Sequence, residues 1–263
     1  MTGRWALRIA TLLGFAFLYI PIGVIVLYAF NAQRVQAWPI QSFSTEWFSA
    51  ALDNESVRGA LLLSLEVGAG ATLVALVLGS LAAFAVQRYR FFGRETVSFA
   101  LVLPIALPGI VTGMALNSSI NATGIGFTTL TIIIGHATFC IVVVYNNVIA
   151  RLRRSSRTIE EASMDLGADA WQTFRHVTLP VIRSALIAGG LLAFALSFDE
   201  IIVTTFTAGT EQTLPIWILS NLARPNQRPI VNVVAVALIV LSAAPVYLAS
   251  RLSGSTGVGG SRT

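Results

Sequence analysis

The sequence predicts an all-α integral membrane protein with six transmembrane helices. Hydrophobic residues make up 55% of its 263 positions and charged residues only 11%, which is less than half of the roughly 25% that soluble domains carry. Six apolar segments are each long enough to cross the hydrocarbon core of a bilayer as a helix, which takes about 20 residues. The alternating segments that build a membrane β-barrel are missing from the sequence, and its composition also excludes intrinsic disorder.

The six predicted spans are free of charge except for three acidic residues. Backbone groups in lipid must be hydrogen-bonded within the segment, so each long apolar run favours a helix. The second span contains Glu66, and the fifth contains Asp199 and Glu200. The first span follows Arg4 and Arg8, as a signal peptide would, but its apolar run exceeds the roughly 7–15 residues of a signal sequence, which favours an uncleaved anchor. The spans cover residues 9–30, 60–86, 96–116, 128–150, 184–208 and 230–250.

The distribution of arginine predicts that both termini face the cytoplasm. All 17 basic residues are Arg, and the N-in, C-in arrangement places 13 of them on the cytoplasmic side, as the positive-inside rule requires. The basic charge is therefore explained by membrane topology, without a nucleic acid partner. Three regions follow: an N-terminal helix with an extracytoplasmic loop in 1–56, a transmembrane domain in 57–250, and a disordered cytoplasmic tail in 251–263.

The longest predicted cytoplasmic segment, residues 151–183, carries the signals of ordered structure. Thr158 and Glu161 have the spacing of a capping box, which predicts a helix that begins at Thr158. Gly167 follows at the position where a helix C-terminus needs a left-handed residue. A second short helix is predicted from Asp169, again with a capping partner three residues on, and the fifth span follows it.

One face of the first predicted helix is apolar and contains small residues. Four positions recur at helical spacing and so share this face: Ile159, Ala162, Ser163 and Leu166. An amphipathic connector lying on the lipid is one interpretation, but the nearby acidic residues would face an anionic leaflet unfavourably. A long ordered loop between tight connections favours docking onto a cytoplasmic protein instead. The acidic residues are Glu160, Glu161, Asp165 and Asp169.

The same loop contains a motif that resembles one of a known protein family. The run Glu161-Ala162-Ser163, then Gly167, then Val177-Thr178-Leu179-Pro180 is similar to the EAA coupling motif of permease subunits in binding-protein-dependent ABC importers. Its spacing and its place between the fourth and fifth of six spans match as well. Ser163 replaces a second Ala and Val177 replaces Ile, and both changes keep a small or apolar side chain. The chain most resembles the second permease of spermidine/putrescine systems, in segments 44–47, 87–93, 161–167 and 194–207.

The resemblance implies the type I importer permease fold and a place in a larger complex. Such a subunit lies in the bacterial inner membrane and pairs with a second permease to form the pathway. An extracytoplasmic binding protein delivers the substrate, here a polyamine or a related small solute, and two cytoplasmic ATP-binding cassette subunits dock on the coupling loop. The chain has no Walker A sequence, and we expect no catalytic residue, cofactor or metal in it. The residues assigned to ATPase coupling are Glu160, Glu161, Ala162, Ser163, Asp165, Leu166, Gly167, Leu179 and Pro180.

Four residues are candidates for the substrate pathway: Trp47, Glu66, Asp199 and Glu200. Acids inside a span are costly and are expected to face a cavity or a partner. Carboxylates and aromatic faces suit a cationic substrate, and the resemblance places Asp199 in the pathway. Glu200 could instead hydrogen-bond a neighbouring helix, and Trp47 could belong to an interfacial aromatic belt. Gly109 stands where spermidine/putrescine permeases tend to carry an acid, which argues against a polyamine unless a partner subunit compensates.

Two other classes fit the pattern less well. An intramembrane protease of the rhomboid type needs a nucleophilic serine motif and a histidine on another span; His136 lies in a span, but no matching serine motif does. A stand-alone secondary transporter or channel is the remaining alternative, because six helices and buried acids allow it. It leaves the ordered cytoplasmic loop without a role.

Overall fold

A computed structural model describes residues 2–254 of the chain, with side chains from residue 4 to residue 252. Within this range every regular element is a helix, and the one β-bridge joins Asn31 and Phe43. The predicted all-α class is confirmed. The predicted tail lies outside the described residues from 255 onward, while residues 251–254 continue the last helix. The elements are α1 Thr2–Ala29, α2 Glu46–Asp53, α3 Glu55–Arg88, α4 Arg94–Ala106, α5 Gly109–Thr123, α6 Thr129–Arg154, α7 Arg157–Asp165, α8 Ala170–Thr173, the π-helix η1 Phe174–Thr178, α9 Leu179–Phe198, α10 Ile202–Thr207, α11 Leu214–Leu222, the 3-10 helix η2 Pro225–Gln227 and α12 Arg228–Gly254.

Five of the described helices are long and apolar enough to cross a membrane, and a sixth crossing results when the bent pair α4 and α5 counts as one broken span. The five are α1, α3, α6, the continuous stretch from α8 through α9, and the stretch from η2 through α12. Each of the six predicted spans therefore corresponds to a helix or a pair of helices in the fold, and the third and fifth spans are interrupted.

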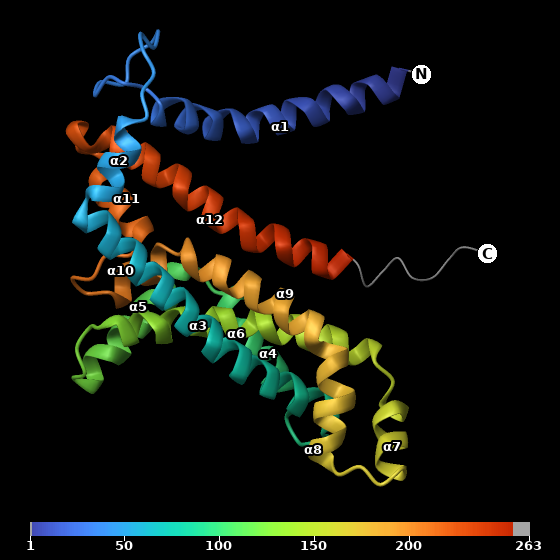
Figure 1. The fold of residues 1–263 in the computed structure, drawn as a ribbon. Helices are drawn as coiled ribbons and strands as arrows, with labels where there is room; N and C mark the ends of the chain where they lie inside the picture. Colours follow the sequence, from blue (N-terminus) through green and yellow to red (C-terminus); the bar gives the residue numbers. More distant parts are fainter. Residues whose placement is uncertain (1, 255–263) are drawn as a thin grey trace.

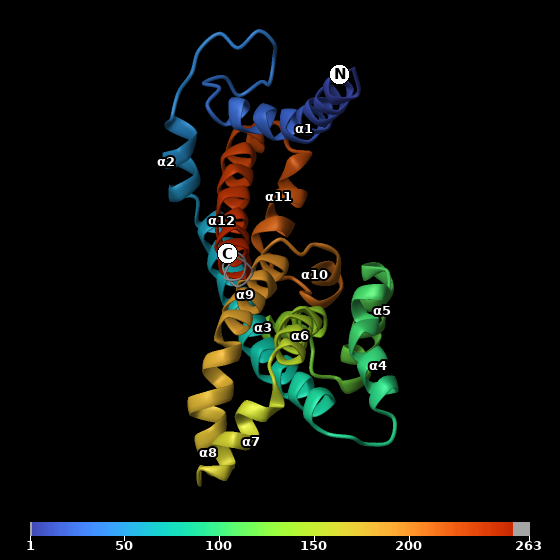
Figure 2. The same cartoon turned by 90° about the vertical axis from the view of Figure 1, so that its right-hand side faces the viewer.

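The centre of the molecule is formed by α3, α6 and α9, which pack against one another (Figures 1 and 2). Small residues let these helices approach closely, as is typical where helices pack inside a membrane. A Cβ on Gly79 would lie 2.8 Å from the carbonyl oxygen of Ile141, so only glycine allows α3 and α6 to come this near. Gly68 packs closely against the ring of Phe194 on α9.

The third predicted span, residues 96–116, is not one helix, and this prediction was wrong. Helix α4 ends at Ala106, α5 begins at Gly109, and the two axes differ by 104°. The cause is Pro108, because it has no N–H to continue the helix and holds Leu107 in an extended conformation (φ −81°, ψ 145°). The hydropathy of the segment does not register this break, since the residues on both sides are apolar.

The fifth predicted span, residues 184–208, is also interrupted. Helix α9 ends at Phe198, and the short α10 begins at Ile202. The two breaks are packed together, because α10 lies against α5 and Phe206 leaves no room for a Cβ on Gly113. The side-chain amide nitrogen of Asn117 on α5 (Nδ2) donates to the backbone carbonyl oxygen of Phe206 at 2.7 Å. This contact gives the polar residues that follow the third predicted span a partner in the fold.

Helix α1 lies apart from the central helices and packs only against α12 among the described elements with substantial contact (Figure 1). None of the residues in its most apolar stretch is buried within the chain. Its apolar surface is therefore left to lipid or to another subunit.

Candidate functional site

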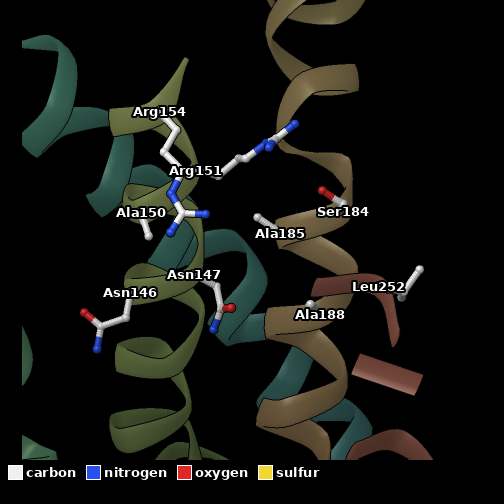
Figure 3. Close-up of a pocket in the computed structure, with 9 residues that line it drawn as sticks. All are labelled: Asn146, Asn147, Ala150, Arg151, Arg154, Ser184, Ala185, Ala188 and Leu252. Carbon is white, nitrogen blue, oxygen red and sulfur yellow. The ribbon is translucent and has the colours of Figure 1, made fainter. Parts of the chain in front are cut away.

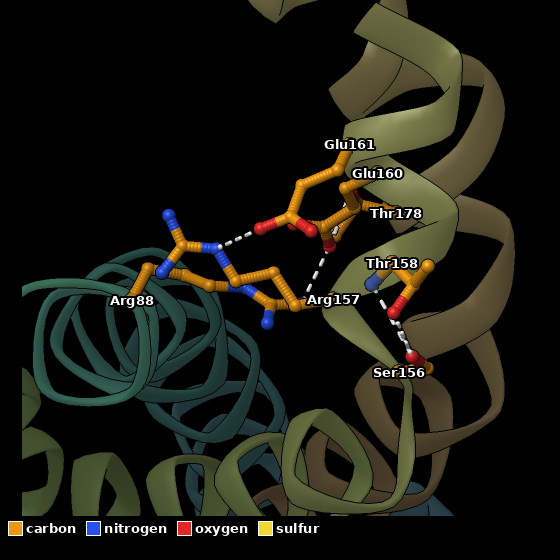
Figure 4. Close-up of polar contacts among 7 residues, drawn as sticks. All are labelled: Arg88, Ser156, Arg157, Thr158, Glu160, Glu161 and Thr178. Carbon is orange, nitrogen blue, oxygen red and sulfur yellow. Dashed lines mark hydrogen bonds and ion pairs between the residues drawn. The ribbon is translucent and has the colours of Figure 1, made fainter. Parts of the chain in front are cut away.

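The coupling loop folds as predicted in outline, but its first helix begins earlier. Ser156 is the N-cap of α7, with an extended backbone (φ −69°, ψ 132°), and its hydroxyl accepts from the amide of Thr158 at 3.2 Å (Figure 4). The predicted capping box between Thr158 and Glu161 is therefore wrong. Glu161 instead forms an exposed ion pair with Arg157 at 3.2 Å, one helical turn earlier. Both Ser156 and Thr158 can cap a helix, and the chain enters the helix at the first of them.

The turn after α7 matches the prediction for Gly167. This residue has φ +94°, and its amide donates to the carbonyl oxygen of Met164 at 2.9 Å. The amide of Ala168 donates to the carbonyl of Ser163 at 3.2 Å, which completes the closure of the helix end. The direction in which the chain leaves α7 is thus set by a backbone conformation that residues with a Cβ rarely adopt.

Replacing Gly167 by Ala is expected to reduce transport activity several-fold without preventing membrane insertion. No atom stands within 4 Å of a Cβ at this position, so the left-handed backbone alone opposes the change, at a cost of about 1–2 kcal/mol. The matched control is Gly59→Ala, because that Cβ also meets nothing within 4 Å but the residue has an ordinary helical conformation. Equal uptake by the two variants would contradict a role for the turn geometry.

The second short helix is capped as predicted. The Asp169 carboxylate accepts from the amide of Gln172 at 2.7 Å, and the Gln172 side chain accepts from the amide of Asp169 at 3.0 Å. Helix α8 then runs through η1 into α9 without a break, because the amide of Leu179 bonds to the carbonyl of Phe174, five residues back. Pro180, which has no N–H, follows this π-helical turn. The second half of the loop is thus continuous with the helix of the fifth span.

The far side of the coupling loop is an exposed surface of apolar and acidic side chains. Helices α7 and α8 project beyond the central helices (Figures 1 and 2). Ala162 and Asp165 are exposed, Ser163 is half-buried with its hydroxyl 3.2 Å from that of Thr173, and Leu179 packs against the central core. Clustered exposed apolar side chains mark an interaction surface. The large exposed apolar residues of the two helices and the turn between them are Ile159, Met164, Leu166 and Trp171, and of these Met164 also lines the cavity between α7 and the end of α3.

The two acids of the fifth span lie at its break, not inside a helix. Asp199 follows the last residue of α9, and its side chain is exposed. The Glu200 carboxylate accepts from the amide of Val203 at 2.9 Å, so it caps the start of α10 and does not reach a neighbouring helix. The expectation that both acids project from one continuous helix was therefore wrong.

A buried histidine that the sequence did not single out holds this break together. One ring nitrogen of His136 on α6, Nδ1, lies 2.7 Å from the hydroxyl of Ser197, and the other, Nε2, lies 2.8 Å from that of Thr204. The Thr204 hydroxyl donates its proton to the carbonyl of Glu200 at 2.8 Å, so it accepts from the imidazole, and the ring proton sits on Nε2. The neutral ring then accepts from Ser197. His136 thus connects α6 to both sides of the break that carries Asp199.

The remaining two candidates differ in their surroundings. Glu66 is exposed on α3, after the exposed Leu65 and before the buried Val67. Trp47 is buried, its indole N–H donates to the carbonyl of Asn31 at 2.9 Å, and the guanidinium of Arg34 lies 5.8 Å from the ring centre. Arg34 therefore occupies the position over the Trp47 ring that a cationic substrate would need.

A polar cavity of about 320 Å³ opens between the ends of α6 and α9 (Figure 3). The Arg151 side chain is fixed in its wall by a hydrogen bond from Nε to the carbonyl of Val181 at 2.9 Å. Arg154 and Asn147 also line it, and none of the described residues in its lining is acidic. The cavity suits neutral or anionic groups, and a cationic ligand is better served by the acids at the α9–α10 break.

Comparison with known proteins agrees with this architecture. Residues 75–254 match the family described as binding-protein-dependent transport system inner membrane component. The chain is 38% identical over 241 residues to the putrescine transport system permease protein PotI of Escherichia coli (strain K12), which covers 88% of this chain and 84% of the relative. It is 35% identical over 240 residues to the spermidine/putrescine transport system permease protein PotC of the same organism, covering 90% and 89%.

Solved structures show the same fold. A bacterial ABC transporter that imports the acidic polysaccharide alginate contains a chain that superposes with a TM-score of 0.72 at 16% identity, covering 97% of this chain and 96% of that chain. At this level of identity the likeness concerns the fold and not the substrate. The two polyamine relatives, the family match and the coupling loop agree. The chain is therefore a multi-pass membrane protein that belongs to the family of inner membrane permease components of binding-protein-dependent ABC importers.

Proposed function

We propose that this chain forms the translocation pathway of a bacterial inner-membrane importer together with a second permease subunit, and that the substrate is a small polyamine. The observation that carries the proposal is the coupling loop, since its exposed surface, which includes Ile159, Glu161 and Leu166, offers a docking surface for an ATP-binding cassette subunit. The chain supplies no ATPase site of its own in this proposal. An extracytoplasmic binding protein delivers the substrate, with both termini of the chain in the cytoplasm.

The substrate class is supported by the relatives named for putrescine and spermidine and by the exposed carboxylate of Asp199 at the α9–α10 break. A protonated amine gains a charge-assisted hydrogen bond from such a carboxylate. Gly109 begins α5 and lies next to Ile202 of α10. The acid that some spermidine/putrescine permeases carry at this place would therefore stand beside the α9–α10 break. Asp199 already supplies a carboxylate at that break, so the missing acid at Gly109 does not exclude a polyamine.

The test is uptake of radiolabelled putrescine into proteoliposomes that contain this chain with its second permease, the ATPase subunits and the binding protein. We expect uptake only when ATP and the ATPase subunits are on the cytoplasmic side and the binding protein is on the other side. Uptake by this chain without ATPase subunits, driven by an ion gradient, would show a secondary transporter instead.

Asp199→Asn is expected to raise the KM for putrescine about tenfold or more, because a charge-assisted hydrogen bond contributes about 1.5–3 kcal/mol. Binding of the ATPase subunits should not change. The matched control is Asp53→Asn, an exposed residue at the end of α2. An unchanged KM for Asp199→Asn would remove this residue from the pathway.

A further inference from the structure

The two adjacent glutamates of α7 point in different directions and have different partners (Figure 4). Glu161 faces solvent, since its side chain is 54% exposed and its partner Arg157 is 64% exposed. Glu160 faces the body of the protein: its side chain is 16% exposed, and it pairs with Arg88, which is 14% exposed, at 2.5 Å. Only Glu161 is therefore free to contact another subunit directly.

Glu160 joins three elements that are distant in the sequence. Its Oε1 atom accepts from the guanidinium of Arg88, the last residue of α3, and from the hydroxyl of Thr178 in η1 at 3.0 Å. Arg88 lies 72 residues before Glu160. The coupling helix is thus tied to the second span and to the base of the fifth span by a single carboxylate.

The contact with α3 depends on this side chain because little else fills the space. Helix α7 packs against α8 and η1, while a cavity of about 280 Å³ separates it from the end of α3, lined by Phe84, Met164 and Phe174 together with the ion pair itself. The Coulomb attraction between two opposite charges is larger where water is excluded than at the surface. Removal of one partner leaves the other as an uncompensated charge, which is destabilising. The pair is therefore the principal direct connection between α7 and α3.

The connection leads into the centre of the membrane domain. Helix α3 has 34 residues and is therefore about 51 Å long at 1.5 Å per residue. It packs against α6 and α9 and carries the exposed Glu66. A displacement of α7 that pulls on Arg88 would shift this helix along its whole length, because α3 is rigid and continuous.

We propose that Arg88 and Glu160 form a strut that transmits movement of the coupling helix to α3, so that Glu160 is a positioning residue and its neighbour Glu161 the docking residue. This inference rests on the proposed function, because it needs an ATPase subunit to displace α7. It assigns the two glutamates separate tasks: one receives the force from the partner, and the other passes it into the membrane domain.

The experiment compares Arg88→Glu, Glu160→Arg and the double charge exchange in the reconstituted transporter, with uptake and ATP hydrolysis measured on the same vesicles. Each single variant should retain bound ATPase subunits and hydrolyse ATP within about twofold of the unmodified protein. Uptake per ATP should fall about tenfold, and the double variant should recover to within about threefold because the pair is restored with reversed charges. Arg90→Glu is the matched control, since this exposed residue lies two positions beyond Arg88.

The outcomes separate the strut from docking and from the proposed function. Loss of ATPase subunits from the Glu160→Arg variant would make Glu160 a docking residue and overturn the inference. Unchanged uptake per ATP in the single variants would overturn it too, as would a double variant no better than the singles. If the unmodified chain never binds an ATPase subunit, the proposed function itself fails, before any variant is compared.

Discussion

Glu161→Lys is expected to reduce ATP-driven uptake at least tenfold and to release the ATPase subunits from the membrane complex. The side chain is exposed on the surface of α7, so the substitution reverses a charge where a partner would make contact. Like charges brought together across an interface cost several kcal/mol, and 1.4 kcal/mol corresponds to a factor of ten in affinity. The amount of ATPase subunit that copurifies with the chain measures the effect directly.

Membrane insertion and thermal stability of the Glu161→Lys variant should stay close to those of the unmodified chain. The ion pair that it removes, between Arg157 and Glu161, is largely solvent-exposed and contributes only about 0–1 kcal/mol. The control is Glu95→Lys, an exposed acid in the first turn of α4, outside the coupling loop. Normal uptake by the Glu161→Lys variant would mean that α7 is not the docking helix.

His136→Phe is expected to cause the second large loss, through the break between α9 and α10. The change leaves the hydroxyl of Ser197 without its imidazole partner, and an orphaned buried group costs about 1–3 kcal/mol. The hydroxyl of Thr204 also loses the imidazole but keeps its hydrogen bond to the carbonyl of Glu200. Both the thermal stability in detergent and the uptake of substrate should fall. The conservative variant His136→Gln can still donate and accept, so it should recover part of both.

A double variant separates stability from positioning. When His136→Phe is combined with Ser197→Ala, no orphaned hydroxyl remains at position 197, while Thr204 still donates to the carbonyl of Glu200. Replacement of both partners by apolar groups can be nearly neutral for stability. Thermal stability should therefore return, while the KM for putrescine should be higher than in the unmodified chain, because the imidazole no longer joins α9 and α10 beside Asp199. Full recovery of uptake in the double variant would show that the histidine serves stability alone.

The helical class and the coupling loop could be read from the sequence because their signals are local. Apolar runs of membrane length, a glycine at the end of a short helix and the capping pair of Asp169 and Gln172 each need only a few neighbouring residues. The N-cap at Ser156 was missed because two hydroxyl residues compete within three positions, and the spacing of Thr158 to Glu161 imitated a capping box.

The breaks and the buried contacts could not be read in the same way. The residues around Pro108 are as apolar as the rest of their span, and the fifth span is apolar overall despite Asp199 and Glu200, so hydropathy does not distinguish a continuous helix from a broken one. The partners of His136 lie 61 and 68 residues away, and the partner of Arg88 lies 72 residues away. Such pairs depend on how whole helices pack against one another, and no local sequence pattern predicts them.

The packing of α5 on α10 has a mechanical consequence. Each is a short segment that follows a break, one after Pro108 and the other after Asp199. Helix α10 is hydrogen-bonded to the long helix α6 at two points: the Thr131 hydroxyl donates to the carbonyl of Thr207 at 2.8 Å, and Nε2 of His136 lies 2.8 Å from the hydroxyl of Thr204. Rotation at the two junctions would let them tilt as one flap while α3, α6 and α9 keep their shape. Most of the membrane domain can therefore stay rigid during a transport cycle, with the bending confined to two points in the backbone.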